Sequence, residues 1–279
     1  MGSGAANCED DVGFRDAVLE TIEAVITSED FRLPAMPGLA SAFMEMNINP
    51  NADAGRVADL IDHDRRLRTR LMRIANSPIY RSHERRVDDS QEAVARIGLM
   101  ETHNFAVFNL IKWEMFVGTH RLLRVQLCRD AVGAAVGCEL IGKRLNMPPD
   151  HIFLLGLLFD IGRPALIDII DELLKTRAFG RARFEQVWQV VDDDLSDRLT
   201  REIMTHWSMP NTIRERLLEA RDAPETRLII EAARQLARAR DRHTISQIIR
   251  LYAEDLGLND ASLEWIVDQH PMAIQRLAA

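Results

Sequence analysis

The sequence has few of the residues that mark secreted, membrane-spanning or metal-rich proteins. It contains three cysteines, and Cys8, Cys128 and Cys138 have neither CxxC spacing nor a zinc-like cluster. No run of about 18 apolar residues is present, and residues 1–12 carry acids in place of an apolar signal core. We therefore expect a cytoplasmic protein with reduced thiols, no membrane partner and no cofactor.

Positively charged residues are also fewer than negatively charged ones. The 35 lysines and arginines are outnumbered by 43 aspartates and glutamates, which gives a formal net charge of −8. Binding to nucleic acid is driven by neutralising phosphates, so we do not expect a nucleic-acid partner. Lysine occurs only at Lys112, Lys143 and Lys175, and arginine supplies the remaining positive charge.

The pattern of apolar residues predicts an all-α fold. Hydrophobic residues make up 47% of the chain, which is enough for a sizeable core. They recur at i, i+3, i+4 and i+7, as in 57–74 and 105–111, with little period-2 alternation. We expect helices near 11–28, 37–48, 52–63, 65–76, 90–98, 101–117, 120–146, 150–159, 163–175, 180–192, 195–208, 211–221, 225–241, 243–257 and 260–278.

A break near residue 118 predicts two lobes. We expect an N-terminal tail with a leading helix (1–30), an N-terminal helical lobe (31–117), a second helical lobe (118–224) and a C-terminal helical extension (225–279). The extension is interpreted either as a small appended bundle or as a cover on the second lobe.

One motif has the spacing of a phosphate-binding loop but the wrong surroundings. Gly137, Gly142 and Lys143 match GxxxxGK, yet they lie inside a helical stretch, and Arg144 stands where magnesium binding needs Ser or Thr. Gly133 and Gly137, four residues apart, instead predict a close approach of two helix backbones. The eight histidines form no HExxH or other tight cluster, so no metal site is expected.

Arginines are concentrated between residues 65 and 86, where eight of them face a single acid, Glu84. On a helix, three of them fall on one outward stripe, at i, i+4 and i+7. Guanidinium groups suit carboxylates and phosphates. The cluster is interpreted as a solvated face, a site for an acidic protein partner, or a site for a nucleotide or nucleic acid. The candidate residues are Arg66, Arg70, Arg73, Arg81, Arg85 and Arg86.

Several motifs resemble the HDOD family in order and spacing, over residues 33–220. The first half has LPAMP at 33–37 and an Asn-Ser pair shortly before Tyr80. The second half has LLGLLFDIGR at 154–163, which resembles the LLHDIGK stretch of the HD superfamily, and WSMP at 207–210, which resembles its WxLP turn. The resemblance implies a two-lobed, all-α HD-like fold. It also implies structural roles for Leu33, Pro34, Pro37, Asn76, Ser77, Gly98, Gly162, Trp207 and Pro210.

The departures from the HD pattern concern the metal ligands. HD phosphohydrolases gather histidines and aspartates around a divalent metal that activates water on a phosphate ester. Here Phe159 stands at the paired histidine, Asp160 remains alone, and Asp130 stands where an upstream histidine is expected. A catalytic metal needs several ligands. The resemblance therefore implies a catalytically degenerate relative that is not an enzyme.

Three functions remain in competition. The first is a non-catalytic regulatory protein of bacterial signal transduction that binds unidentified signalling proteins in trans. The second is a sensor of a cyclic dinucleotide or another nucleotide, bound in the cleft between the lobes by arginines. The third is a residual metal-dependent phosphohydrolase that uses Asp130, Asp160 and either Asp193 or Asp194.

Overall fold

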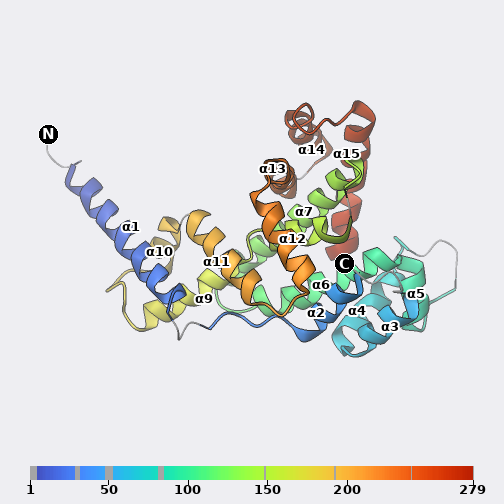
Figure 1. Cartoon of the computed structure of the whole chain (residues 1–279), viewed down its shortest axis with the longest axis horizontal. Helices are drawn as coiled ribbons and strands as arrows, with labels where there is room; N and C mark the ends of the chain where they lie inside the picture. The colour runs from blue at the N-terminus through green and yellow to red at the C-terminus, as the bar shows by residue number, and fades with distance from the viewer. Residues whose placement is uncertain are drawn as a thin grey trace.

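A computed structural model of the chain describes residues 5–28, 32–47, 53–80, 85–147, 149–191, 193–239 and 241–278. Every regular element within these ranges is a helix, so the all-α prediction is confirmed (Figure 1). Each helix overlaps one of the ranges expected from the sequence, although α1 begins six residues before its range, at Ala5. The helices are α1 (Ala5–Ile26), α2 (Gly38–Asn47), α3 (Ala54–Asp62), α4 (Arg65–Ala75), α5 (Ser90–Ile97), α6 (Leu99–Met115), α7 (Arg121–Arg144), α8 (Pro149–Leu158), α9 (Gly162–Lys175), α10 (Phe184–Val190), α11 (Asp193–His206), α12 (Asn211–Asp222), α13 (Pro224–Arg238), α14 (Arg242–Leu251) and α15 (Asp260–Ala278).

Helices α2 to α6 form the first lobe, and short acidic caps set where three of them begin. Asp53 accepts a hydrogen bond from the Arg56 amide at 2.8 Å and so caps α3. Asp64 caps α4, and Asp89 caps α5 in the same way. Such a cap satisfies an amide that has no partner within the helix. The three caps keep the connections short, and α3, α4 and α5 pack against one another.

Helix α7 is the centre of the second lobe, and glycines let its neighbours approach its backbone. A Cβ atom added to Gly133 would lie 2.2 Å from the Cβ of Ala237, and one added to Gly137 would lie 2.7 Å from the Cβ of Ala233. Both alanines belong to α13. The predicted close approach of two helices is therefore confirmed, and the GxxxxGK segment lies in the interior of α7.

The junction between the lobes is fixed by one buried arginine. The Arg124 guanidinium donates hydrogen bonds to the carbonyl oxygens of Met115 at 2.8 Å, Thr119 at 3.0 Å and Pro164 at 3.3 Å. It also pairs with Asp168 on α9. Because a buried cation needs such partners, the end of α6, the start of α7 and α9 are held in one arrangement.

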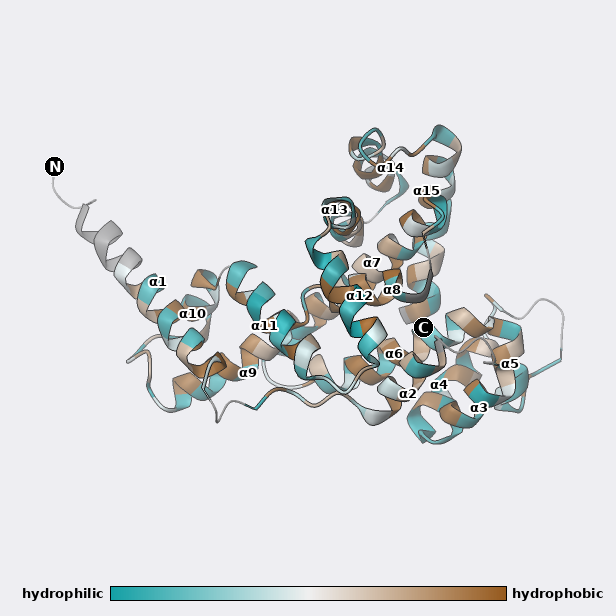
Figure 2. Ribbon diagram, viewed as in Figure 1, coloured by the Kyte–Doolittle hydropathy of each residue, from teal (hydrophilic) through white to brown (hydrophobic). Residues whose placement is uncertain are grey.

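The C-terminal helices cover the second lobe, which is the second of the two arrangements considered from the sequence. Helices α13 and α15 both pack on α7, and α14 lies against α13 and α15 (Figure 1). Helix α8 packs on α7 and α12, and α11 and α12 carry hydrophilic outer faces (Figure 2). None of the described helices is long and apolar enough to cross a membrane.

Candidate functional site

The three positions that depart from the HD pattern meet in one cavity. Asp130 on α7 and Phe159 and Asp160 at the end of α8 line a space of about 400 Å³, together with Arg163 at the start of α9 and Arg234 on α13. Asp130, Phe159 and Asp160 lie within 30 positions of one another in one lobe, but Arg234 comes from the C-terminal extension. The extension therefore completes this cleft.

Two guanidinium groups lie close to the Phe159 ring. The Arg221 guanidinium carbon lies 4.5 Å from the centre of the Phe159 ring, and that of Arg234 lies 5.5 Å from it. Arg221 also donates a hydrogen bond to the Phe159 carbonyl oxygen at 2.7 Å, and Arg234 pairs with Asp160 at 3.0 Å. Cations are attracted to the face of an aromatic ring, so the phenyl group that replaces a histidine is a partner for both arginines.

Arg221 is fully buried and belongs to a wider ionic network. It pairs with Asp197, which Arg201 also contacts at 2.6 Å, and Arg201 in turn contacts Asp222 at 2.7 Å. Burial favours the neutral form of Asp197, but hydrogen bonds from Arg201 and Arg221 outweigh it and hold the pKa of this carboxyl below its usual value. Burial lowers the pKa of Arg221, against the opposing effect of Asp197. The network holds α11 and α12 beside the cleft.

The side chains of the cleft do not fit a divalent metal. Asp160 is already paired with Arg234, Asp130 accepts a hydrogen bond from Gln126 at 2.8 Å, and Asp193 pairs with Arg163. None of the described residues that line this cavity is a histidine. Throughout the described ranges, no group of three or more His, Cys, Asp or Glu side chains has the placement of a metal site. A metal ion would have to compete with arginines for each of two carboxylates.

Two motifs that lie far apart in the chain are joined by a hydrogen bond. The Trp207 indole Nε1 donates to the Pro34 carbonyl oxygen at 2.8 Å. We call this contact the tryptophan clasp. Pro37 follows and begins α2, since its carbonyl accepts from the Ala40 amide at 2.8 Å, and Pro210 stands just before α12. Leu33 packs on the core beside this clasp.

The remaining motif residues fix turns and close contacts. The Asn76 side chain exchanges two hydrogen bonds with the backbone of Val87, each at 2.9 Å, and so ties the end of α4 to the segment before α5; Ser77 follows it. Gly98 separates α5 from α6 with a φ of +104°, which disfavours any side chain. A Cβ on Gly162 would lie 2.5 Å from the carbonyl oxygen of Ser196, so α9 and α11 touch there.

These motif contacts agree with the match of a family profile, that of the HDOD domain, to residues 33–223. The chain belongs to the HDOD family. Among solved structures, an HDOD domain protein of unknown function from Geobacter sulfurreducens superposes with a TM-score of 0.57 at 19% identity, over 95% of this chain and 99% of its own. A search of curated proteins found no match.

Two further structures share the HDOD fold. A protein from Shewanella amazonensis SB2B, provisionally named a metal-dependent phosphohydrolase, has a TM-score of 0.65 at 18% identity and covers 95% of this chain and 99% of its own. A protein from Marinobacter aquaeolei VT8, provisionally named a signal transduction protein, has a TM-score of 0.59 at 16% identity, over 96% of this chain and 65% of its own. These matches extend past residue 223, so helices α13 to α15 also have counterparts in the related folds.

The arginine cluster of this HDOD protein does not form one surface. Arg66 lies over the Trp113 ring at 4.3 Å and contacts Asp64 at 3.2 Å, and Arg73 is exposed. Arg70 is half-buried, and burial followed by the charge of Arg73 lowers its pKa. The other members lie elsewhere. Arg85 contacts Glu92 at 3.1 Å, Arg86 contacts Asp88 at 3.7 Å, and Arg81 lies outside the described residues.

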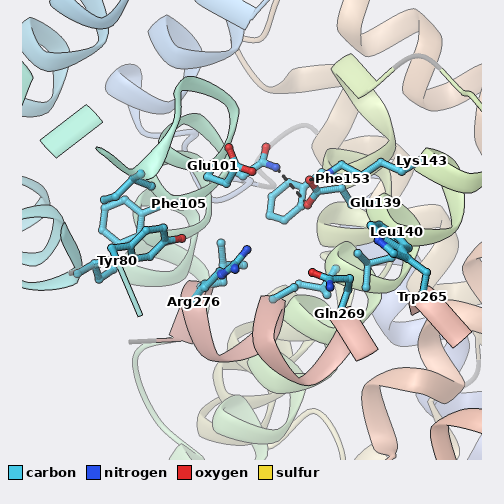
Figure 3. A pocket seen from close by; sticks show the side chains of 16 residues that line it. Tyr80, Glu101, Phe105, Glu139, Leu140, Lys143, Phe153, Trp265, Gln269 and Arg276 are labelled. Carbon is cyan, nitrogen blue, oxygen red and sulfur yellow. Dashed lines mark hydrogen bonds and ion pairs between the residues drawn. The ribbon is translucent and has the colours of Figure 1, made fainter. Parts of the chain in front are cut away.

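The cleft between the lobes is small and does not contain the arginine stripe. Figure 3 shows Arg276 of α15 reaching toward Tyr80, with Glu101 and Lys143 on the opposite side. The space is about 90 Å³, well below the ~300–1,000 Å³ typical of small-molecule sites. The nucleotide site considered from the sequence stays a prediction.

We call the cavity lined by Asp130, Phe159 and Asp160 the HD cleft. Sequence reasoning missed two arginines there, Arg234 in its lining and Arg221 against Phe159, although the sequence carries a signal for both. Arg221 follows Ile213 and Leu217 at spacings of four, on the apolar side of α12. Arg234 follows Ile230 by four residues on α13. A charged residue that continues an apolar stripe is buried with a partner or faces a cavity, and both outcomes occur here.

Proposed function

We propose that this HDOD protein is a non-catalytic regulatory protein of bacterial signal transduction that binds other signalling proteins in trans. The observation that carries the proposal is the pairing of Phe159 and Asp160 with Arg221 and Arg234. These guanidinium groups contact the two positions at which the HD pattern has a paired histidine and aspartate. Like charges repel strongly where water is scarce, so this cleft opposes the entry of a divalent cation.

The surface of α4 supports a protein partner of acidic character. Arg65, Arg66, Arg68 and Arg73 are exposed on this helix. Two neighbouring acids, Asp62 and Asp64, offset only part of this charge, through contacts of 3.2 Å each, so the helix presents net positive charge. Complementary charge on a partner would steer association and fix its orientation.

The absence of catalysis is tested by direct assay. The purified chain is incubated with manganese and either bis(4-nitrophenyl) phosphate or cyclic di-GMP, beside the Asp160→Ala variant. We expect no turnover above the rate of the variant. Hydrolysis by the wild-type chain that Asp160→Ala abolishes would overturn the proposal and establish a phosphohydrolase.

Partner binding is tested by charge reversal on α4. Arg66→Glu and Arg73→Glu are combined and compared with Arg121→Glu and Arg181→Glu, two exposed arginines elsewhere, which change the net charge equally. Cross-linking in cells followed by quantitative mass spectrometry should show a partner reduced at least tenfold by the α4 pair and retained by the control pair. Equal recovery from both would contradict a role for α4.

A nucleotide panel decides between a protein partner and a small-molecule signal. Thermal unfolding is followed with cyclic di-GMP, cyclic di-AMP, ATP, GTP and ppGpp, without manganese. A ligand at about 100 times its dissociation constant adds roughly 2.7 kcal/mol to the free energy of unfolding, which corresponds to several degrees. We expect no rise; a clear rise with one nucleotide would replace the proposal with a sensor.

A further inference from the structure

A second cavity lies where the HDOD domain meets the C-terminal helices. It has a volume of about 480 Å³, within the ~300–1,000 Å³ range of small-molecule sites. Its walls come from α6, α7, α14 and α15, and from the end of α13. The apolar lining includes Phe108, Val132, Ile245 and Ile274. It is distinct from the HD cleft, whose lining carries acidic as well as basic side chains.

Two cations line this cavity without an acidic partner. They are Lys112 on α6 and Arg129 on α7, and no Asp or Glu is among the lining residues that the structure describes. No ion pair of either cation occurs within the described ranges. Burial chiefly, and also the nearby Arg70, lower the pKa of Lys112. Positive charge crowded beside an apolar space is stabilised by an anion.

An unpartnered imidazole lines the same cavity. The His270 side chain on α15 is only 1% exposed, and its Nε2 atom is buried with no hydrogen-bond partner. Burial lowers the pKa of His270 to about 4, so the ring is neutral at pH 7 and retains one N–H donor. A buried polar atom without a partner costs free energy, and a polar group on a ligand could satisfy it.

The lining also indicates what kind of molecule the cavity accepts. Among the described residues that line it, none is an Asn, Gln, Ser, Thr, Asp or Glu whose side chain could read the hydrogen-bonding edge of a nucleobase or a sugar. Its aliphatic and phenyl groups fit a hydrocarbon chain, whereas ammonium and guanidinium groups pair with carboxylate or phosphate.

We propose that this cavity binds an amphipathic organic anion, in which a carboxylate or phosphate is carried on an aliphatic chain. Lys112 and Arg129 pair with the anionic group, and Phe108, Ile245 and Ile274 cover the chain. This site is separate from the regulatory role proposed above, and an experiment that contradicts one of the two proposals leaves the other unaffected. Because α6 and α7 meet α14 and α15 around the ligand, binding would stabilise the docking of the C-terminal helices on the HDOD domain.

Calorimetric titration of the full chain with four probes tests this ligand class. Sodium dodecanoate and dodecyl phosphate, below their critical micelle concentrations, carry both features; 1-dodecanol lacks the charge, and acetate lacks the chain. We expect one site for an anionic amphiphile, at least tenfold weaker binding of dodecanol, and no binding of acetate. The ratio between the two anionic probes distinguishes a carboxylate from a phosphate ligand. Equal binding of dodecanol and dodecanoate would overturn the role of the cations.

A double variant locates the binding to this cavity. Lys112→Met with Arg129→Met removes both charges but keeps most of each aliphatic stem, and Lys175→Met on the exposed part of α9 is the control. The double variant should bind dodecanoate at least tenfold more weakly and dodecanol as before, with a melting temperature that shows it is folded. Wild-type affinity for dodecanoate in the double variant would show that the anion binds elsewhere and contradict the proposal.

Discussion

Helix α13 contacts the rest of the protein in two very different ways. In the glycine seam, formed by Gly133 and Gly137 of α7 against Ala233 and Ala237, backbones touch because side-chain atoms are missing. In the HD cleft, a neighbouring face of the same helix places Arg234 beside Phe159 and Asp160.

The two contacts differ in how much change in sequence they tolerate. The seam is apolar and has no room for an added atom, so it determines how close α13 lies to α7. The cleft is held together by ion pairs. In one of them, the side chains of Asp160 and Arg234 are 34% and 32% exposed. Solvent-screened pairs contribute little to stability and tolerate exchange. We infer that the seam fixes the architecture and that the cleft is the part free to change function.

The largest effect is expected from adding one methyl group to the seam. Gly133→Ala places a Cβ 2.2 Å from that of Ala237 and 2.5 Å from its Cα, so the helices must separate. Overpacking should lower the free energy of unfolding by about 3 kcal/mol, although alanine favours a helix. Chemical denaturation measures it. The same exchange at Gly13, where nothing lies within 4 Å, should stabilise the protein slightly. Stabilisation at both positions would contradict the seam.

A smaller loss is expected when the cleft loses its buried cation. Arg221→Met leaves the Phe159 carbonyl without its 2.7 Å donor, while Asp197 keeps Arg201. We expect the free energy of unfolding to fall by about 2 kcal/mol. Arg198→Met, which removes an exposed pair with Glu23, should cost less than about 1 kcal/mol in the same denaturation experiment. Equal losses would show that burial of Arg221 is unimportant.

The smallest effect is the pH dependence of stability, which we expect from the ionic network around Arg201 and not from the glycine seam. Hydrogen bonds from Arg201 lower the pKa of Asp222 and help to lower that of Asp197 below the reference value of 3.8. A lowered carboxyl pKa stabilises the fold above about pH 4, and this contribution is lost as pH falls through the folded-state value. Because both carboxylates are exposed by more than a third, the effect is about 1 kcal/mol or less.

Urea denaturation at pH 7 and pH 3 measures this contribution. Arg201→Met should lose less stability on acidification than the wild-type chain, since its two carboxylates no longer have that cation. Gly133→Ala should lose as much as the wild type, because the seam contains no titratable group. If Arg201→Met lost as much stability between pH 7 and pH 3 as the wild-type chain, these pKa shifts would not contribute to the stability of the fold.

The fold could be predicted from the sequence because its elements are amphipathic. Leu67, Leu71 and Ile74 recur on one side of α4 and are all buried, as their spacing predicts. Helix ends were less predictable. Helix α14 stops at Leu251 rather than near 257, where Gly257 with a φ of +64° lies in the turns that follow. Periodicity shows which face is buried but not where local hydrogen bonding changes.

The candidate site was predictable only in part. The HD resemblance brought Asp130, Phe159 and Asp160 together, but it could not supply Arg234, which lies beyond residue 223 where the family profile ends. The cavity beside Lys112 was also invisible, because a void arises from how helices cross and not from the pattern along any one of them.

The tryptophan clasp between Trp207 and Pro34 has a consequence for how the chain folds. Its partners are 173 residues apart, so the hydrogen bond closes a loop over most of the HDOD domain. The helices between them gain their own contacts at much shorter separation, and loop closure costs entropy that grows with length. We therefore expect the clasp to form late, after the transition state. A contact of this kind governs how fast the protein unfolds more than how fast it folds, and it sets the lifetime of the native state.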